Sequence, residues 1–323
     1  MKYLVTGGAG YIGSIVATML LEEGHEVVVL DSLVTGAAER VPAGAELVAR
    51  PVQEIGEVLD GTFDGVLHFA GLIAAGESME KPGLYWEANT TGTLRLLDAM
   101  RAAGVKTLVF SSTAAVYGNP TEVPIREAAV KAPTSTYGAT KLSADMAIQS
   151  AVTAHGLAAV SLRYFNVVGA YKDENGIWHG ENHDPETHII PIAFEAATGE
   201  RDHFAIFGDD YPTPDGTCIR DYIHVADLAD AHLLALDAAK EGEHRIYNLG
   251  NGRGFSNRQV VETVKKITGA DFEVRTGPRR AGDPAELVAS SEKARAELGW
   301  KPSRDSLDRM VADAWEYHQH VHA

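Results

Sequence analysis

A glycine-rich loop near the start of the chain places the strongest constraint on the fold. Between a short apolar run at residues 3–6 and a helical pattern at residues 12–23, the chain reads Thr6-Gly7-Gly8-Ala9-Gly10-Tyr11-Ile12-Gly13. Glycines at this spacing allow a sharp turn out of a strand and bring the next helix N-terminus against a pyrophosphate, whose charge the free amides stabilise. The motif predicts a dinucleotide-binding loop, although a tight turn that only packs helix on strand fits the same glycines.

An acidic residue after the next apolar run supports the dinucleotide interpretation. Asp31 follows the predicted strand at residues 26–30 and stands 18 positions after Gly13. A carboxylate at this place accepts hydrogen bonds from the adenosine ribose and repels a 2′-phosphate, so we expect NAD rather than NADP. A role for Asp31 as a cap or turn residue is the alternative.

Short apolar runs alternate with helical patterns along the first half of the chain, which predicts a doubly wound parallel sheet with helices on both faces. Further strands are predicted at residues 65–69, 107–111 and 158–165, and helices at 86–103 and 137–155. Beyond Gly169 the predicted elements are shorter and lie between irregular loops: helix 189–198, strand 205–207, helix 225–239 and strand 246–249. We expect a dinucleotide-binding domain over residues 1–168, joined by later segments near 221–250, and a smaller substrate-binding lobe over residues 169–323.

Composition excludes several classes of protein. The 28 Lys and Arg residues against 45 Asp and Glu residues give a net charge of −17, which repels a nucleic-acid backbone. The only cysteine, Cys218, permits no internal disulfide and fits a reducing compartment. No uninterrupted apolar run reaches about 18 residues. We therefore expect a cytoplasmic protein with neither nucleic acid nor membrane as a partner.

A tyrosine and a lysine four residues apart are the candidate catalytic pair. Tyr137 and Lys141 share one face of the predicted helix 137–155, and a nearby ammonium group favours the phenolate form of tyrosine. Ser111 and Thr113 end the preceding strand, at the edge where open α/β sheets bind ligands, and a hydroxyl there can relay a proton. An exposed pair on a helix surface is the alternative for Tyr137 and Lys141.

These motifs together resemble the extended short-chain dehydrogenase/reductase family. The resemblance rests on residues 6–13, His-Phe-Ala-Gly at 68–71, Ser-Ser-Thr-Ala-Ala-Val-Tyr-Gly at 111–118, Tyr-x-x-x-Lys at 137–141 and Arg-Tyr-Phe-Asn at 163–166. Later segments are similar to the nucleotide-sugar 4-epimerases within that family, namely residues 205–208, 210–217, 220–225, 247–250 and 279–283. Ala114 and Ala115 stand where the related 4,6-dehydratases need an acid and a base, which speaks against dehydration.

The resemblance implies a Rossmann fold and an NAD-dependent epimerisation at C4 of a UDP-hexose, UDP-galactose to UDP-glucose, through a transient 4-keto sugar. It implies catalysis by Tyr137, Lys141 and Thr113. It also implies a homodimer that pairs the helices 86–103 and 137–155. The residues that it assigns to NAD are Gly7, Gly10, Tyr11, Ile12, Gly13, Asp31, Ser32, Phe69, Ala70, Gly71, Asn89, Ser111, Tyr137, Lys141 and Tyr164. Those that it assigns to the UDP-sugar are Thr113, Tyr137, Phe165, Asn166, His188, Ile189, Ala205, Phe207, Arg220, Arg280, Asp283 and Leu287.

Three positions depart from the pattern of this family. Ile73 replaces a lysine near the cofactor, and Arg50-Pro51-Val52 replaces a Gly-Asp pair that contacts the adenine, so we expect less than one retained NAD per chain. Leu287 stands where members restricted to UDP-glucose and UDP-galactose often have tyrosine, which leaves room beside C2 of the sugar. UDP-N-acetylglucosamine is therefore a candidate second substrate.

Two groups of histidines are assigned no metal-binding role at this point. The loop 179–188 carries three histidines among acidic residues, Glu181, Asp184 and Glu186, without helical ligand spacing, so we expect no metal there. His318, His320 and His322 are expected to fray into solvent at the C-terminus. Two alternative functions stay open, an epimerase of another nucleotide sugar such as a UDP-pentose and a non-catalytic NAD-binding sensor.

Overall fold

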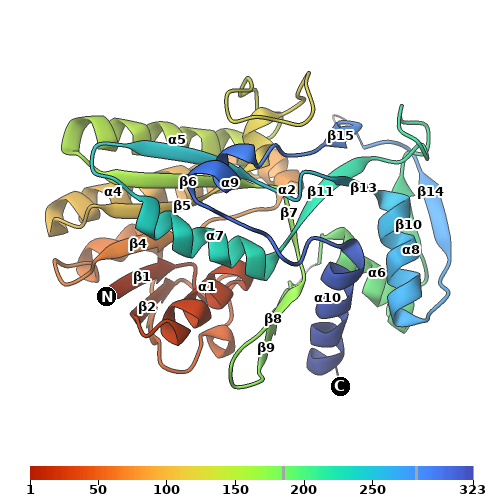
Figure 1. Ribbon diagram of the computed structural model, residues 1–323, viewed down its shortest axis with the longest axis horizontal. Coiled ribbons are helices and arrows are strands. Elements are labelled where there is room, and N and C mark those ends of the chain that lie inside the picture. The colour runs from red at the N-terminus through yellow and green to blue at the C-terminus, as the bar shows by residue number, and fades with distance from the viewer. Residues whose placement is uncertain (184–185, 281–282, 323) are drawn as a thin grey trace.

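Parallel strands form a central seven-stranded sheet in the computed structural model, which describes residues 1–183, 186–280 and 283–322 (Figure 1). The strand order is β12-β6-β5-β4-β1-β2-β3, and each neighbouring pair is parallel. The order reverses between β1 and β4, which opens a crevice at the carboxyl edge of the sheet. The strands are β1 (Lys2–Thr6), β2 (Glu26–Asp31), β3 (Glu46–Ala49), β4 (Gly65–His68), β5 (Thr107–Thr113), β6 (Ala158–Tyr164) and β12 (His244–Leu249).

Helices cover both faces of this sheet because its strands are apolar on both sides. Successive residues point to opposite faces, so Val5 joins one core cluster and Leu4 the other. The first cluster lies under α1 (Tyr11–Glu22) and α7 (Val225–Ala238), where Trp300 closes it and donates a hydrogen bond from Nε1 to the Asp227 carbonyl at 2.7 Å. The second lies under α4 (Gly92–Ala103) and α5 (Thr136–His155). The predicted doubly wound sheet is confirmed.

A smaller group of elements stands beside one end of the sheet (Figure 1). Its helices α6 (Ile189–Thr198), α8 (Asn257–Thr268) and α10 (Leu307–Val321) bury Phe194, Val264 and Met310 in a separate cluster. Strand β10 (Phe204–Phe207) pairs in parallel with β14 (Val274–Gly277). Strand β11 (Ile219–His224) pairs with β7 (Asn166–Val168), β13 (Gly254–Ser256) and β15 (Glu286–Leu287).

The remaining elements are short and connect these layers. Strands β8 (Ala170–Lys172) and β9 (Trp178–Gly180) form an antiparallel hairpin below α1. The others are η1 (Ala38–Arg40), η2 (Val52–Glu57), α2 (Ala75–Glu80), α3 (Pro82–Tyr85), η4 (Ala114–Tyr117) and α9 (Glu292–Glu297). Among the described residues, no helix combines the length and apolar character that crossing a membrane requires.

Two expectations from the sequence are wrong in detail. The helix expected over residues 86–103 begins with a π-helical turn, η3 (Trp86–Thr91), and becomes α-helical only at Gly92. His318 and His320 do not fray, because α10 continues through both of them. His318 stacks on Trp315 of the same helix with ring centroids 5.3 Å apart. It also contacts Phe194 of α6 at a centroid distance of 5.3 Å, and this contact holds the last turns on α6.

Candidate functional site

The glycine-rich loop forms a cradle at the carboxyl end of β1 that no side chain could enter. Gly7 has a φ of 73°, and a Cβ there would lie 2.5 Å from the Ala70 amide nitrogen. A Cβ on Gly13 would lie 2.3 Å from the Gly7 carbonyl oxygen. Helix α1 begins after Gly10, which provides no side-chain cap for its first amides. Those amides and the helix dipole suit a pyrophosphate, so the cradle fits a dinucleotide.

Asp31 and Tyr11 fix the shape of this cradle. The Asp31 carboxylate accepts hydrogen bonds from the amides of Ala9 at 3.0 Å and Leu33 at 2.9 Å, so it also has the turn role that was its alternative. The Tyr11 hydroxyl donates to the Gly169 carbonyl at 2.6 Å and ties the start of α1 to the second lobe. Ile12 packs against the core cluster beneath α1, and Ser32 is exposed beside Asp31.

The loop after β4 meets the π-helical turn and α5 at one point. Asn89, which is buried, accepts a hydrogen bond from the Leu72 amide at 2.8 Å and donates to the Leu72 carbonyl at 3.0 Å. Its Nδ2 also lies 3.0 Å from the Thr140 hydroxyl oxygen. A Cβ on Gly71 would lie 2.8 Å from Asn89 Oδ1 and 3.5 Å from Lys141 Nζ. Phe69, Ala70 and Gly71 are therefore held against the helix that carries Tyr137 and Lys141.

Lys141 is buried and points back to the end of β5. Its ammonium group donates to the Ser111 carbonyl at 3.0 Å and lies 4.9 Å from the centre of the Phe110 ring. Burial lowers the pKa of Lys141 to about 8, although the charge of Asp145 acts in the opposite direction. The Ser111 hydroxyl forms a hydrogen bond with that of Tyr164 on the next strand. The structure thus brings Ser111, Lys141 and Tyr164 together.

Tyr137 is half-buried at the start of α5, and the Thr113 hydroxyl lies near enough to its phenol to affect its pKa. Burial raises the pKa of Tyr137, and the Thr113 hydroxyl offsets part of that rise. The effect expected from Lys141, which favours the phenolate, does not appear in the pKa of Tyr137, because the Lys141 ammonium group is turned to the Ser111 carbonyl. The Thr113 oxygen accepts the Ala115 amide at 3.1 Å, so its own hydrogen is available to Tyr137.

The second lobe presents two arginines. Arg220 on β11 pairs with Asp283, and the Arg280 guanidinium lies 4.2 Å from the centre of the Phe207 ring on β10. Ala205 lies two residues before Phe207 on the same strand, so both point to one face. Residues 281 and 282, within the motif 279–283, lie outside the described part of the chain.

Leu287 joins the two lobes. It stands opposite Arg220 in the β11–β15 register, and with Phe165 it packs against the apolar cluster that includes Val116. Asn166 donates from Nδ2 to the Asp221 carbonyl at 3.1 Å. His188 and Ile189 stand at the start of α6, where His188 is bonded to Glu181 rather than to any of these groups.

A buried ion pair beneath the site was not anticipated from the sequence. Asp145 on α5 and Arg163 on β6 are 4% and 2% exposed, and their side chains meet at 2.7 Å. Ser112 donates to the same carboxylate oxygen at 3.2 Å, and Arg163 also donates to the Tyr117 hydroxyl at 3.1 Å. A charged residue inside the apolar run 158–165 was the available signal.

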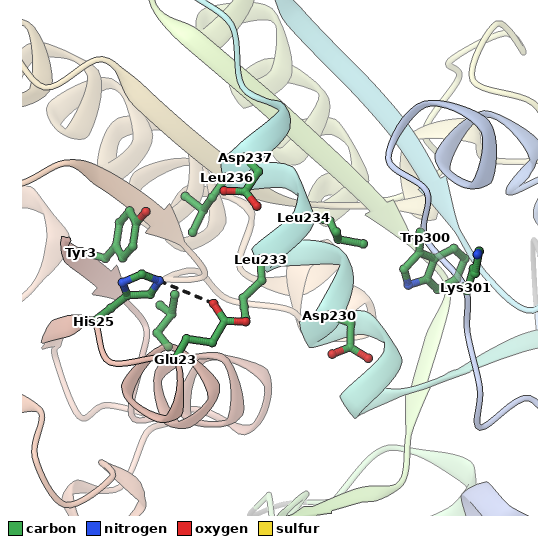
Figure 2. A pocket seen from close by; sticks show the side chains of 11 residues that line it. Tyr3, Glu23, His25, Asp230, Leu233, Leu234, Leu236, Asp237, Trp300 and Lys301 are labelled. Atoms are coloured by element: carbon green, nitrogen blue, oxygen red, sulfur yellow. Dashed lines mark ion pairs between the residues drawn. The ribbon is translucent and has the colours of Figure 1, made fainter.

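One cavity, of about 330 Å³, lies away from these residues (Figure 2). It opens between α1, α7 and the segment around Trp300, near the amino ends of β1 and β2. Tyr3 and His25 border it, and His25 pairs with Glu23 at 3.5 Å. Because open α/β sheets bind ligands at the carboxyl edge, this cavity is not the functional site.

The fold and the site together define a class of protein. A dinucleotide cradle follows β1, and a Tyr-x-x-x-Lys pair meets a strand-end hydroxyl after β5, both at one edge of a doubly wound sheet. This is the architecture of a short-chain dehydrogenase/reductase. The sequence profile of the NAD dependent epimerase/dehydratase family matches residues 3–250, and the chain belongs to that family.

Characterised relatives match over nearly the whole chain. A UDP-glucose 4-epimerase of Corynebacterium glutamicum is 55% identical over 98% of this chain and 95% of its own length. The crystal structure of UDP-glucose 4-epimerase from Brucella ovis in complex with NAD superposes with a TM-score of 0.92 at 42% identity, covering 98% of both chains. That of the Bifidobacterium longum enzyme in complex with NAD+ and UDP has a TM-score of 0.91 at 35% identity, covering 99% of this chain and 98% of that one.

Proposed function

We propose that this protein is an isomerase that interconverts UDP-galactose and UDP-glucose by NAD-dependent epimerisation at C4 of the hexose. The observation that carries the proposal is the hydroxyl pair of Thr113 and Tyr137 beside the buried Lys141, at the carboxyl edge of β5. Ala114 and Ala115 follow Thr113, so no acid or base stands there to eliminate water. The similarity to UDP-glucose 4-epimerases over nearly the full length supports the same conclusion.

NAD fits the cradle after β1. The uncapped amides after Gly10 would hold its pyrophosphate, and the Asp31 carboxylate would accept hydrogen bonds from its adenosine ribose. Phe69, Gly71 and the groups around Lys141 would hold its nicotinamide end. When bound, NAD supplies a reversible hydride acceptor for C4 of the sugar.

Side chains of the protein accept and return the proton of the sugar's 4-hydroxyl group. Tyr137 accepts the proton of the 4-hydroxyl group, with Thr113 as the relay between them, and returns it to the same oxygen once the sugar has turned and C4 has been reduced on its other face. Burial raises the pKa of Tyr137 and so favours its neutral form, and the Thr113 hydroxyl opposes that preference. Lys141 contributes a nearby positive charge, held by the Ser111 carbonyl and the Phe110 face. Thr113 ends β5, and Tyr137 and Lys141 lie on α5, so regular elements fix all three groups in place.

The second lobe holds UDP and leaves the hexose free to turn. Guanidinium groups pair with phosphate in a bidentate geometry, which explains two arginines, Arg220 and Arg280, in an acidic chain. Asp283, which pairs with Arg220 in this structure, accepts hydrogen bonds from the uridine ribose. Phe207 contacts the uracil. We assign residues 1–168 with the later segments near 221–250 to the NAD-binding lobe, and residues 169–323 mainly to the UDP-sugar lobe. Strand β12, which joins the central sheet, and α7, which packs on its core, support this assignment.

The protein acts in the cytoplasm as a homodimer that pairs α4 and α5 with their copies. Apolar side chains at Leu94 on α4, Met146 on α5 and Trp86 on η3 are exposed. Exposed apolar groups on these elements support such an interface. Analytical ultracentrifugation with Leu94→Glu tests it: the variant should sediment as a monomer, and an unchanged dimer would contradict the assignment.

Proton NMR of the protein with UDP-galactose tests the reaction. We expect conversion to UDP-glucose, and loss of it in Tyr137→Phe. Tyr171→Phe is the matched control, because its hydroxyl bonds Glu22 away from the strand ends and its loss should leave turnover intact. Turnover of a UDP-pentose but not of UDP-galactose would favour another nucleotide-sugar epimerase. NAD binding with no turnover of any nucleotide sugar would favour the sensor.

A further inference from the structure

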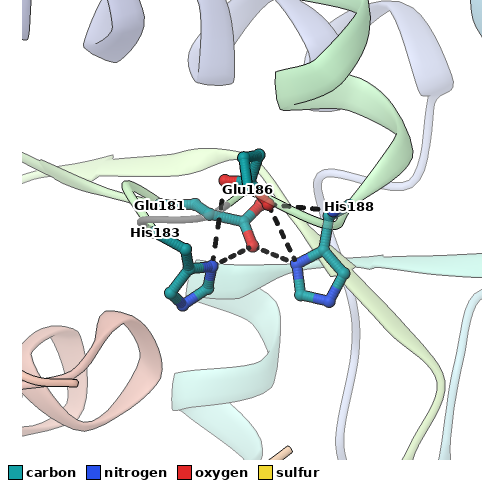
Figure 3. Close-up of side chains that lie close together, drawn as sticks. All are labelled: Glu181, His183, Glu186 and His188. Atoms are coloured by element: carbon teal, nitrogen blue, oxygen red, sulfur yellow. Dashed lines mark hydrogen bonds and ion pairs between the residues drawn. The ribbon is translucent and has the colours of Figure 1, made fainter. Parts of the chain in front are cut away.

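Four metal-ligating side chains converge in the segment between β9 and α6, where the sequence predicted none (Figure 3). Ligand atoms of Glu181, His183, Glu186 and His188 all lie within 4.8 Å of one another. His183 Nδ1 stands 3.2 Å from Glu181 Oε1 and 3.8 Å from Glu186 Oε2. His188 Nδ1 lies 4.0 Å from Glu186 Oε1 and is bonded to Glu181. Tetrahedral ligands at zinc-bond lengths stand about 3.3 Å apart, so small side-chain shifts complete the geometry.

Fixed elements position these groups although the sequence has no helical ligand spacing. Glu181 follows the last residue of β9, and His188 is the residue that precedes α6. The Glu186 carboxylate accepts hydrogen bonds from the amides of Thr187 at 2.7 Å and His188 at 2.8 Å. Arg40 donates to the Asn182 carbonyl in the same segment. Such outer contacts orient a metal ligand before the ion binds. Asp184 lies outside the described residues.

The charges in this cluster call for a divalent cation. The carboxyl side chains of Glu181 and Glu186 are 8% and 6% exposed, and burying two carboxylates requires two compensating positive charges. The imidazoles of His183 and His188 lie beside these carboxylates, where each can hold either a proton or a metal ion. One divalent ion replaces two protons without changing the net charge.

We propose that Glu181, His183, Glu186 and His188 form a four-coordinate zinc site. Two imidazoles and two carboxylates are a donor set that zinc accepts, and four protein ligands leave no open position for a reacting water. The ion therefore has a structural role. It joins the β8–β9 hairpin to the start of α6 and so fixes His188 and Ile189, which border the nucleotide in the proposed function.

The cluster also lies near the residue that Tyr11, at the start of α1, binds. Glu181 and Gly169 line one small cavity beside α6. Tyr11 in turn holds the Gly169 carbonyl at 2.6 Å. A zinc ion in the cluster thus stands where the two lobes meet.

Metal analysis of the NAD-loaded, untagged protein tests the proposal. After incubation with zinc chloride and gel filtration, we expect about one zinc per chain in the wild type and none in His183→Gln. His179→Gln is the matched control, because His179 bonds Asp173 at 3.0 Å, outside the four ligands. His322→Gln controls for zinc held by the C-terminal histidines. Both controls should keep the ion. Titration should show zinc binding to His183→Gln weakened by at least the 10- to 100-fold that loss of an outer-shell partner costs.

Two results would overturn the proposal: a wild type without zinc, or equal zinc in wild type and His183→Gln. Cobalt substitution of the wild type provides a test that needs no variant. A tetrahedral site gives strong visible absorption, and a weak octahedral spectrum would refute the assigned ligands. These measurements do not depend on turnover, so their outcome is separate from that of the epimerase test.

Discussion

Replacing Gly13 by alanine should destabilise the protein, although position 13 lies in a helix, where alanine is normally the more stable residue. Alanine in place of glycine within a helix ordinarily adds about 0.5–1 kcal/mol of stability. At position 13 the new Cβ would lie 2.3 Å from the Gly7 carbonyl oxygen and 2.9 Å from its carbon. Both are backbone atoms that cannot rotate away, and the oxygen is about 1 Å closer than an ordinary contact.

Overpacking of this kind costs about 1–3 kcal/mol, so the net loss is on the order of 1–2 kcal/mol. An unfolding entropy of about 2.1 cal/mol/K per residue over 323 residues converts this loss into a drop in Tm of roughly 2–3 °C. The larger effect is on the affinity for NAD, because the clash pushes the start of α1 away from the glycine-rich loop that would hold the cofactor. A displacement of about 1 Å at a functional site can reduce its performance on the order of 100-fold. We therefore expect the dissociation constant for NAD to rise at least about tenfold.

Thermal unfolding followed by circular dichroism, with and without NAD, measures both effects. Gly76→Ala is the matched control, since Gly76 lies in α2 and a Cβ there meets no atom within 4 Å. That variant should unfold at or slightly above the wild-type temperature and keep the full rise in Tm on adding NAD. The reasoning fails if Gly13→Ala unfolds with the wild type and is stabilised equally by NAD.

Three further outcomes are expected. Acid release should yield less than one NAD per chain, because Ile73 and Arg50 are exposed and Arg50 pairs with Glu54 and Glu57 instead of a nucleotide; Ile73→Lys should raise the yield, and full occupancy in the wild type would contradict this. Leu287→Tyr should remove activity on UDP-N-acetylglucosamine while activity on UDP-galactose remains, as NMR of both reactions would show; a wild type inactive on the N-acetyl sugar would end the idea. Asp145→Ala should lower the free energy of unfolding in urea by about 3–5 kcal/mol, because Arg163 stays buried without its partner, whereas Glu292→Ala at an exposed pair should change it little.

Sequence reasoning located most of the sheet because buried parallel strands are short apolar runs with clear ends. The predicted strand at residues 65–69 and the observed β4 differ by one residue. Residues expected in the site stand where those strands end, as the rule for open sheets requires. A signal was overlooked at α8, where Ser256 and Gln259 form a capping box before an amphipathic helix.

Long-range pairings left no local pattern to find. Tyr11 bonds to Gly169, 158 positions away, and nothing near either residue indicates the other. The cluster around Glu181 was dismissed because its ligands lack helical spacing, yet a loop between two fixed elements brought them together. The pKa of Tyr137 was judged from its neighbour in the helix, whereas its burial decides the direction.

The π-helical turn at Trp86–Thr91 makes the contacts of Asn89, which lies inside it, sensitive to insertion and deletion. Such a turn holds one residue more than an α-helix does over the same rise, so removing a residue such as Thr90 would restore regular winding. Positions on either side of the turn would keep their faces, because the wide turn and the regular turn cover nearly the same angle, but residues inside the turn would be displaced. Asn89 would swing away from Leu72 and Thr140, while Leu94 would keep its place on the outer face. We therefore expect functional homologues to vary in side chains along this segment but to keep its length.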